Sequence, residues 1–153
     1  KKYVTLIVVS MFIISAGFTQ QAQFLDRILL ATELDCLGAV TLVLGATDQI
    51  TDDLSEDNAW GMLEQHGWDI ELVKEEPITV AEYSFLIVNA FKIKGGILYS
   101  LFPSPRYALR ELKWRGVVAS SLDPDEKFDG TVALYILQNA MDILAVSTEG
   151  DIK

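Results

Sequence analysis

The side chain best suited to acid–base chemistry near neutral pH is His66, the only histidine of the chain. A nucleophilic triad would have to use it, and the sequence holds no Gly-x-Ser-x-Gly turn to present a serine. His66 directly precedes Gly67, a residue type that commonly ends helices, so a place at a helix C-terminus is the simpler interpretation. We therefore expect a protein that is not an enzyme and that uses no cofactor.

Carboxylates are concentrated in residues 47–76, where Lys74 is the single opposing cation. Calcium prefers such oxygen ligands, and residues 125–136 come nearest to a calcium-binding loop. Lys127 occupies the third position of that loop, where an oxygen ligand is needed, and Ile136 stands where a bidentate glutamate belongs. One cysteine and one histidine cannot build a Cys/His zinc cage either. We therefore expect a solvated acidic face and no metal site.

A second group of charges is basic, because residues 92–115 carry six cations and one carboxylate, Glu111. Arg106, Arg110 and Lys113 follow one another at helical spacing and would share a face. Arginine among aromatic rings suits an anionic glycan, a wall polymer or a protein partner, whereas a solvated face over core aromatics is the plainer alternative. The candidate binding residues are Arg106, Arg110, Lys113, Arg115, Tyr107 and Trp114, together with Trp60 from the acidic part.

The composition limits the partners that these residues can serve. A chain of 153 residues that is 50% apolar and 22% charged suits one globular domain. Its net charge of -10 argues against a general nucleic-acid binder, which needs a basic face toward phosphates. The basic residues between 92 and 115 could nevertheless bind an anionic partner. The acidic part could also receive the basic surface, within one copy or between copies, so self-association is a further option.

The N-terminal residues 1–22 have the layout of a secretory signal peptide: two lysines, an apolar run and small residues before a polar stretch. The apolar run is shorter than the roughly 20 residues that a spanning helix needs, which favours a cleaved signal. An uncleaved anchor is the alternative and would add a membrane contact. We therefore expect residues 23–153 to form a single domain in the periplasm or outside the cell.

The periodicity of the remaining chain is helical, which predicts an all-α domain. We expect a leading helix over residues 24–46, either interrupted at Gly38 or divided in two. A second helix over residues 54–66 should start at Ser55, a residue type that caps helices, with acidic residues in its first turn.

The later helices carry their own start signals. Thr79 and Glu82 have the spacing of a capping box, in which each side chain satisfies an unpaired backbone amide of the first turn. Ser104 followed by a proline is another start signal, with the serine as cap. Asp129 is expected to cap a last helix that ends at about Leu144.

The helices recur with a fixed order of features. Residues 78–90 and 128–140 are separated by 50 positions and share apolar triplets and a terminal Asn-Ala. We therefore expect two helix-loop-helix units, residues 54–92 and 104–144, with residues 32–44 as a partial further copy. Such periods indicate helix-pair modules that need a neighbour to bury their apolar faces.

The unit resembles the S-layer homology repeat, described by a helix, a glycine turn, a loop rich in Pro and Asp, and a second helix introduced by Thr-Arg-Ala-Glu. Here the corresponding stretch is Thr79-Val80-Ala81-Glu82. The resemblance covers about residues 54–144 and implies non-covalent attachment to peptidoglycan or another wall polymer. In that family the motif arginine helps to form the glycan site, whereas this chain has Val80 there and Gly130-Thr131 in the second copy.

These observations together favour a small exported, non-enzymatic protein that binds or organises a component of the cell envelope. The first hypothesis is binding of a cell-wall glycan through the basic residues and their neighbouring aromatics. The second is an interaction subunit of an envelope assembly, which would use the acidic and basic faces to bind an envelope protein.

Overall fold

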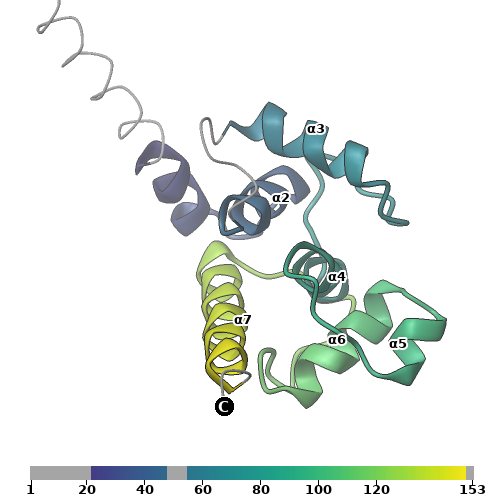
Figure 1. Cartoon of the computed structure of the whole chain (residues 1–153). Helices are drawn as coiled ribbons and strands as arrows, with labels where there is room; N and C mark the ends of the chain where they lie inside the picture. The colour runs from purple at the N-terminus through teal and green to yellow at the C-terminus, as the bar shows by residue number, and fades with distance from the viewer. Residues whose placement is uncertain (1–21, 48–54, 151–153) are drawn as a thin grey trace, which may run out of the picture.

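The computed structural model describes residues 22–47 and 55–150, with the backbone alone for residues 146–150. The predicted signal peptide, residues 1–22, lies outside this part except for its last residue. Residues 48–54, which belong to the acidic stretch of the sequence, lie outside it as well. The described chain is helical and contains no β-strand, which confirms the all-α prediction. A helical segment over residues 22–30 precedes α2 (Cys36–Gly45), α3 (Glu56–His66), α4 (Val80–Ala90), α5 (Ile97–Leu101), α6 (Pro105–Trp114) and α7 (Gly130–Gly150), shown in Figure 1. Among these residues, no helix combines the length and the apolar character that crossing a membrane requires.

The leading stretch, residues 24–46, is two helices rather than one. The first ends at residue 30, and Asp35 caps α2 by accepting a hydrogen bond from the amide of Gly38 at 2.6 Å. Gly38 is therefore inside α2 and does not interrupt it. A Cβ atom at Gly38 would lie 2.8 Å from Cδ1 of Ile28, so this glycine permits close approach of the first two helices.

Asp35 was not predicted as a cap, and three of the four predicted caps are confirmed by their hydrogen bonds. The Ser55 hydroxyl accepts from the third amide beyond it at 3.3 Å, and Asp129 accepts from Val132 at 2.8 Å. Thr79 and Glu82 make both bonds of the capping box. The prediction of a side-chain cap at Ser104 is wrong, because Ser104 makes no such bond.

The start of α6 follows from its proline instead. Pro105 occupies the first helical position, where it lacks only an amide that would have no partner in the helix, and its fixed φ suits the helix.

Two further features differ from expectation. The short helix α5 was not predicted, and α7 extends beyond Leu144 to Gly150.

The N-terminal ends of α2, α4 and α7 meet in the centre of the molecule. The residues directly before their caps are Leu34, Ile78 and Phe128, and all three are buried. The amide of Leu34 donates to the carbonyl of Phe128 at 2.8 Å, and the amide of Ile78 donates to the carbonyl of Leu34 at 2.9 Å. This short series of backbone bonds holds three segments together that lie far apart in the sequence.

The first two amides of α2 and of α4 also find partners outside their own helices. Helix N-termini leave such amides unpaired, and here they donate to the loop that precedes the next of the three central helices. The pairs are Cys36 to Glu76 at 2.9 Å, Leu37 to Lys74 at 3.0 Å, Val80 to Glu126 at 3.0 Å and Ala81 to Pro124 at 3.1 Å. The loops are therefore fixed by the helix ends that they cover.

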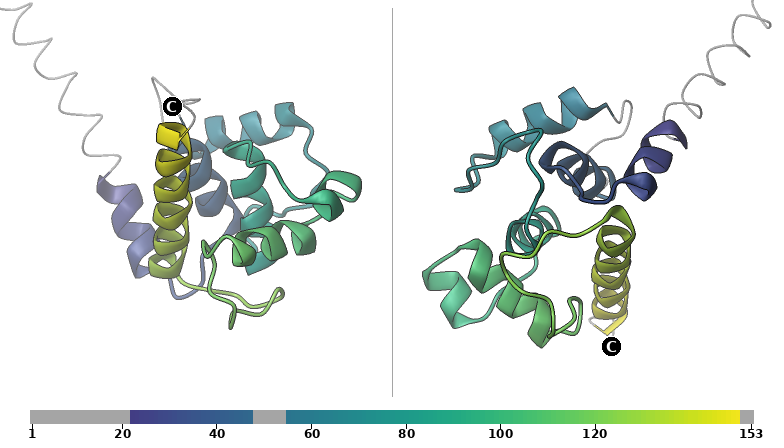
Figure 2. Two further views of the ribbon diagram at one scale, coloured as in Figure 1. Left: turned by 60° about the horizontal axis from the view of Figure 1, so that its bottom comes forward. Right: turned by 180° about the vertical axis from the view of Figure 1, so that it is seen from behind.

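Each central helix carries a neighbour on its outer side. Helix α3 packs on α2, and α6 packs on α4 (Figure 1). Segment 22–30 lies against the start of α7, where the backbone of Ile28 is in contact with Gly130. Figure 2 shows the same arrangement from two other sides, with α5 at an edge of the molecule beside α6.

Tyr83 is the largest side chain that is completely buried in this core. Its hydroxyl donates to the carbonyl of Ala133 in α7 at 3.1 Å, and its ring packs at a tilt on Phe128 with 5.3 Å between centroids. Burial raises the pKa of the Tyr83 phenol above its ordinary value. Tyr83 thus joins α4 to α7 through both packing and a hydrogen bond.

The capping bonds lead to a direct test of stability. We expect Thr79→Ala to lower the free energy of unfolding by about 1 kcal/mol, because the amide of Glu82 would lose its side-chain partner. Ser104→Ala is the matched control and should change stability far less, since Ser104 makes no capping bond. Urea denaturation followed by circular dichroism measures both. Equal losses in the two variants would contradict this account of the helix starts.

Candidate functional site

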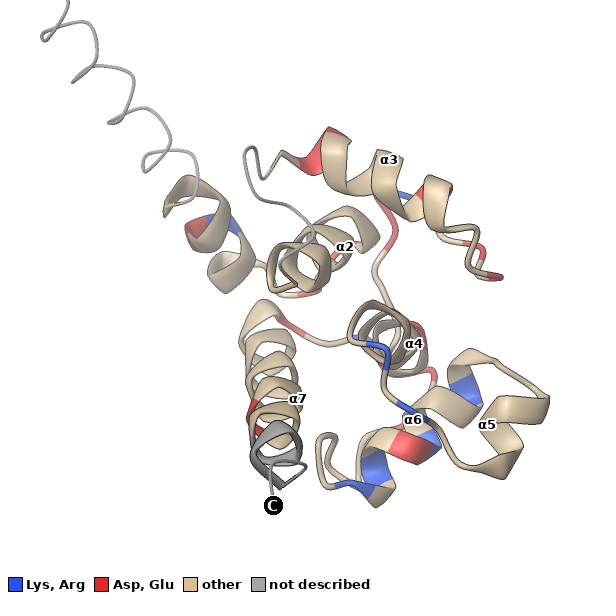
Figure 3. Ribbon diagram, in the orientation of Figure 1, with Lys and Arg blue, Asp and Glu red and all other residues tan. Residues whose placement is uncertain are grey.

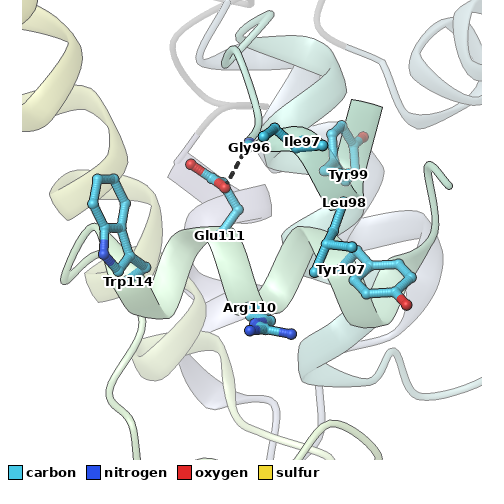
Figure 4. A pocket seen from close by; sticks show the side chains of 8 residues that line it. All are labelled: Gly96, Ile97, Leu98, Tyr99, Tyr107, Arg110, Glu111 and Trp114. Carbon is cyan, nitrogen blue, oxygen red and sulfur yellow. Dashed lines mark hydrogen bonds between the residues drawn. The ribbon is translucent and has the colours of Figure 1, made fainter. Parts of the chain in front are cut away.

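A pocket of about 310 Å³ lies between α5 and α6 (Figure 4). Helix α6 has two faces: its buried residues, Ala108, Leu109 and Leu112, belong to the core. The other face carries Tyr107, Arg110, Glu111 and Trp114, which line the pocket together with Gly96, Ile97, Leu98 and Tyr99. Pairs on this face are three or four residues apart, so one turn of helix brings each next to the following one.

The four predicted cations do not act as one group, because three of them have partners in the protein. Arg106 pairs with an exposed aspartate, Lys113 donates to two loop carbonyls, and Arg115 donates to Glu111 at 2.8 Å. Within the part of the chain that the structure describes, Arg110 has no ion pair or hydrogen bond, and it is exposed. Arg110 is therefore the predicted cation whose donors stay available to a ligand.

Glu111 does not neutralise Arg110, although the two residues are neighbours in the sequence. One carboxylate oxygen of Glu111 accepts from Arg115, and the other accepts from the amide of Gly96 at 2.9 Å. Arg115 also donates to the carbonyl of Lys94 at 2.6 Å. These bonds tie the loop before α5 to α6, so Glu111 and Arg115 position the pocket rather than offer it free charges.

The aromatic side chains of the pocket differ in how they are held. Asn89 donates to the Tyr99 hydroxyl at 3.1 Å, and the Tyr99 ring packs edge-on against Phe85. Partial burial raises the pKa of the Tyr99 phenol, and the bond from Asn89 opposes that shift. Tyr107 is half-buried, whereas Trp114 is 81% exposed and projects from the end of α6 (Figure 4). The pocket therefore contains the anchored ring of Tyr99, the exposed ring of Trp114 and Arg110, whose side chain has no partner among the described residues.

The structure places Trp60 away from this site. Trp60 lies on α3, is 9% exposed, and donates through its ring nitrogen to Glu64 at 3.0 Å. The ammonium of Lys74 lies 5.4 Å from the centroid of its ring. Trp60 belongs to a second pocket, between α3 and the loop that follows it, so it is not brought together with the α6 candidates.

His66 and Cys36, the other residues suited to acid–base or nucleophilic chemistry, have surroundings that indicate a structural role. The ring of His66, at the end of α3, stacks on Trp68 with 4.8 Å between centroids. Cys36 is buried, and this burial raises the pKa of its thiol to about 11. Among the described residues, no cluster of three His, Cys, Asp or Glu side chains could hold a metal ion.

Helix α5 belongs to the site although no pattern in the sequence predicted it. No residue of α5 is buried, although most of its side chains are apolar. The apolar types of residues 97–102 resemble core positions, and their short length gives no period by which to tell an exposed face. The glycine pair before them and Pro103 after them were the one available signal of a separate surface element.

Comparisons with known proteins add no assignment. A scan against protein-family models finds no match, and searches of the curated proteins and of the solved structures find none at a significant level. The candidate site is therefore interpreted from its own geometry.

Proposed function

We propose that this chain is an exported, non-enzymatic helical module that binds an anionic glycan or polymer of the cell envelope in the α5–α6 pocket. The observation that carries the proposal is the guanidinium of Arg110, which has no partner among the described residues and lines the same pocket as the open ring of Trp114. Export to the periplasm or cell surface rests on the signal-like layout of residues 1–22.

The proposal includes an architecture of S-layer-homology-like repeats. It is supported by the equivalent roles of Leu34, Ile78 and Phe128, which each precede a capped central helix. It is supported further by the matching bonds of the first two amides of α2 and α4 to the next loop. Residues 54–92 and 104–144 would be two units, and residues 22–46 a shortened third.

The proposed site is not at the helix starts where the family carries its arginine. The first residues of α2, α4 and α7 are Cys36, Val80 and Gly130, and all three are buried without charge. A glycan could therefore find no cation at these positions. The α5–α6 pocket offers the cation instead, at the outer surface of the second unit.

The chemistry of the pocket suits an acidic sugar polymer. A free guanidinium presents a fork of donors that matches a carboxylate or a phosphate in two bonds. The exposed face of Trp114 and the half-buried Tyr107 offer flat apolar surfaces against which a sugar ring can pack. Because Glu111 is held by Arg115 and Gly96, the charge next to the ligand would be positive.

Binding of purified peptidoglycan sacculi tests this function. We expect Arg110→Gln and Trp114→Ala each to weaken binding by about tenfold, which corresponds to roughly 1.4 kcal/mol. Arg106→Gln is the matched control: Arg106 lies on the same helix, but it faces Asp125 in an exposed pair and does not line the pocket. Binding should also fall as salt rises, because the arginine contact is electrostatic.

The outcome separates the two functional hypotheses. Sacculus binding that is equal in all three variants and the unaltered chain would overturn the glycan site. Capture of an envelope protein with no binding to sacculi would favour the interaction subunit. That second candidate has its own support in the exposed apolar side chains of α5, since such patches commonly mark contacts with other molecules.

A further inference from the structure

The outer side of α5 is an apolar surface without a partner in the described chain. It consists of Ile97, Leu98, Leu101 and Phe102, called the α5 surface from here on. Ile97 is 80% exposed, Leu101 64% and Phe102 62%. The helix lies at an edge of the molecule in all views (Figure 1 and Figure 2). Contiguous apolar side chains of this kind are costly in water and indicate a docking surface.

A complementary feature lies on another part of the same molecule. The pocket of about 320 Å³ between α3 and the following loop, called the α3 pocket, is lined by Trp60, Leu63, Glu64, Gly67, Trp68, Ile70, Glu71 and Leu72. Its lining is mainly apolar and aromatic, with carboxylates among it. Val73, which directly follows the lining residue Leu72, is half-exposed.

The charges around the two features are opposite. Figure 3 marks acidic residues along α3 and its following loop, and basic residues on and around α6. Glu71 lines the α3 pocket, and the exposed Asp69 lies between Trp68 and Ile70, which also line it. Arg106 and Arg110 lie on α6, the helix on which α5 packs. A contact between the two features would bury apolar groups at its centre and bring opposite charges together at its border, as in typical protein interfaces.

From this complementarity, we propose that the α5 surface of one copy docks into the α3 pocket of a second copy. The two features are carried on different neighbours, α5 on α6 and α3 on α2, so the contact is head-to-tail. A head-to-tail contact leaves the other feature of each copy free, and association can therefore continue into chains. An anionic lipid surface suits the patch less well, because the chain as a whole carries a net charge of -10.

Sedimentation equilibrium of the full chain tests the contact. We expect concentration-dependent association in the unaltered chain and a dissociation constant at least about tenfold higher for Leu101→Ser/Phe102→Ser, because two apolar side chains leave the interface. Both positions are already exposed in one copy, so folding should be preserved. Any association through residues 1–21 is common to both proteins and cancels in the comparison.

A charge exchange identifies the partner surface. Arg106→Glu/Arg110→Glu and Asp69→Lys/Glu71→Lys should each associate poorly alone, because each places like charges across the contact. An equimolar mixture should associate again, since every contact between unlike copies then joins opposite charges. The second variant leaves the bond between Trp60 and Glu64 intact. A contact that does not join these two surfaces would not restore association in the mixture.

Three results would overturn the proposal: association unchanged in the Leu101→Ser/Phe102→Ser variant, no recovery in the mixture, or flotation with phosphatidylglycerol vesicles that requires Leu101 and Phe102. The first would remove the α5 surface from the contact, the second the α3 pocket, and the third would assign the surface to lipid. Ile97, Leu98 and Arg110 also line the proposed glycan pocket, so variants outside these three residues separate self-association from glycan binding. Trp114→Ala should weaken sacculus binding and leave self-association intact, whereas Leu101→Ser/Phe102→Ser should do the opposite, because neither residue lines the α5–α6 pocket.

Discussion

Gly130→Ala is expected to lower the free energy of unfolding by about 3 kcal/mol, at the upper end of the cost of overpacking. A Cβ atom at Gly130 would lie 1.9 Å from the carbonyl oxygen of Ile28 and 2.6 Å from its carbonyl carbon. Both obstacles are backbone atoms, so no side-chain rotation can relieve the overlap. Segment 22–30 and the start of α7 would have to move apart. The contact between the first and the last helix of the described chain would then be lost.

Thermal and urea denaturation measure this effect, and a second glycine provides the control. Gly61 lies inside α3 with no atom within 4 Å of the position of an added Cβ. Gly61→Ala should therefore stabilise the protein by roughly 0.5–1 kcal/mol, because alanine is the better helix former. A Gly130→Ala variant as stable as the unaltered chain would show that Ile28 and α7 are not packed as described.

Tyr83→Ala is expected to cost about 3–5 kcal/mol, as for other large aromatic side chains removed from a core. The ring is completely buried, so its loss leaves a cavity between α4 and α7 and removes the contact with Phe128. Tyr83→Phe keeps the ring and removes the bond to the Ala133 carbonyl, and should cost only about 1 kcal/mol. Denaturation in urea at neutral pH compares the two variants.

Alkaline pH separates the hydroxyl from the ring. Burial raises the pKa of Tyr83 above its ordinary value of 10.0, so the folded protein keeps the phenolic proton at a pH where the unfolded chain releases it. The unfolded state then binds fewer protons, and stability should fall as the pH rises above about 10, by roughly 1.4 kcal/mol per pH unit from this group. Tyr83→Phe lacks this contribution. An identical decline in the two proteins above that pH would contradict the burial of the hydroxyl.

Local signals in the sequence were sufficient for most helix starts. Ser55, Thr79 and Asp129 cap helices as predicted, because a capping bond spans only three residues and depends on little else. Ser104 failed as a cap because Pro105 starts its helix without the serine bond. The two-helix alternative for residues 24–46 is correct, whereas the alternative of an interruption at Gly38 is wrong, because Gly38 marks a close contact with Ile28 rather than the end of a helix.

The sequence predicted which helix carries the candidate site but not which residues line the pocket. The predicted face was Arg106, Arg110 and Lys113, and only Arg110 of these lines the pocket. Tyr107 and Trp114, which were candidates as neighbouring aromatics, line it as well. The pattern could not show that Arg106 pairs with Asp125 or that Arg115 also donates to the loop before α5, because these partners are distant in the sequence. The pair of Arg115 with Glu111, four residues apart on one helix, is local. Trp60 was included for its type alone, and it belongs to α3 and to a different pocket.

What the sequence determined by itself was the helical class, the capped starts of α3, α4 and α7 and the segregation of acidic and basic residues, because each depends on neighbours within a few positions or on composition. The tertiary structure alone decided which charges stay free and which apolar side chains stay in water. Arg110 is unpaired, within the described residues, because the loop before α5 occupies Glu111, and Ile97 is exposed because α5 packs on α6 without entering the core. Contacts between residues distant in sequence determine both outcomes, and no local pattern encodes them.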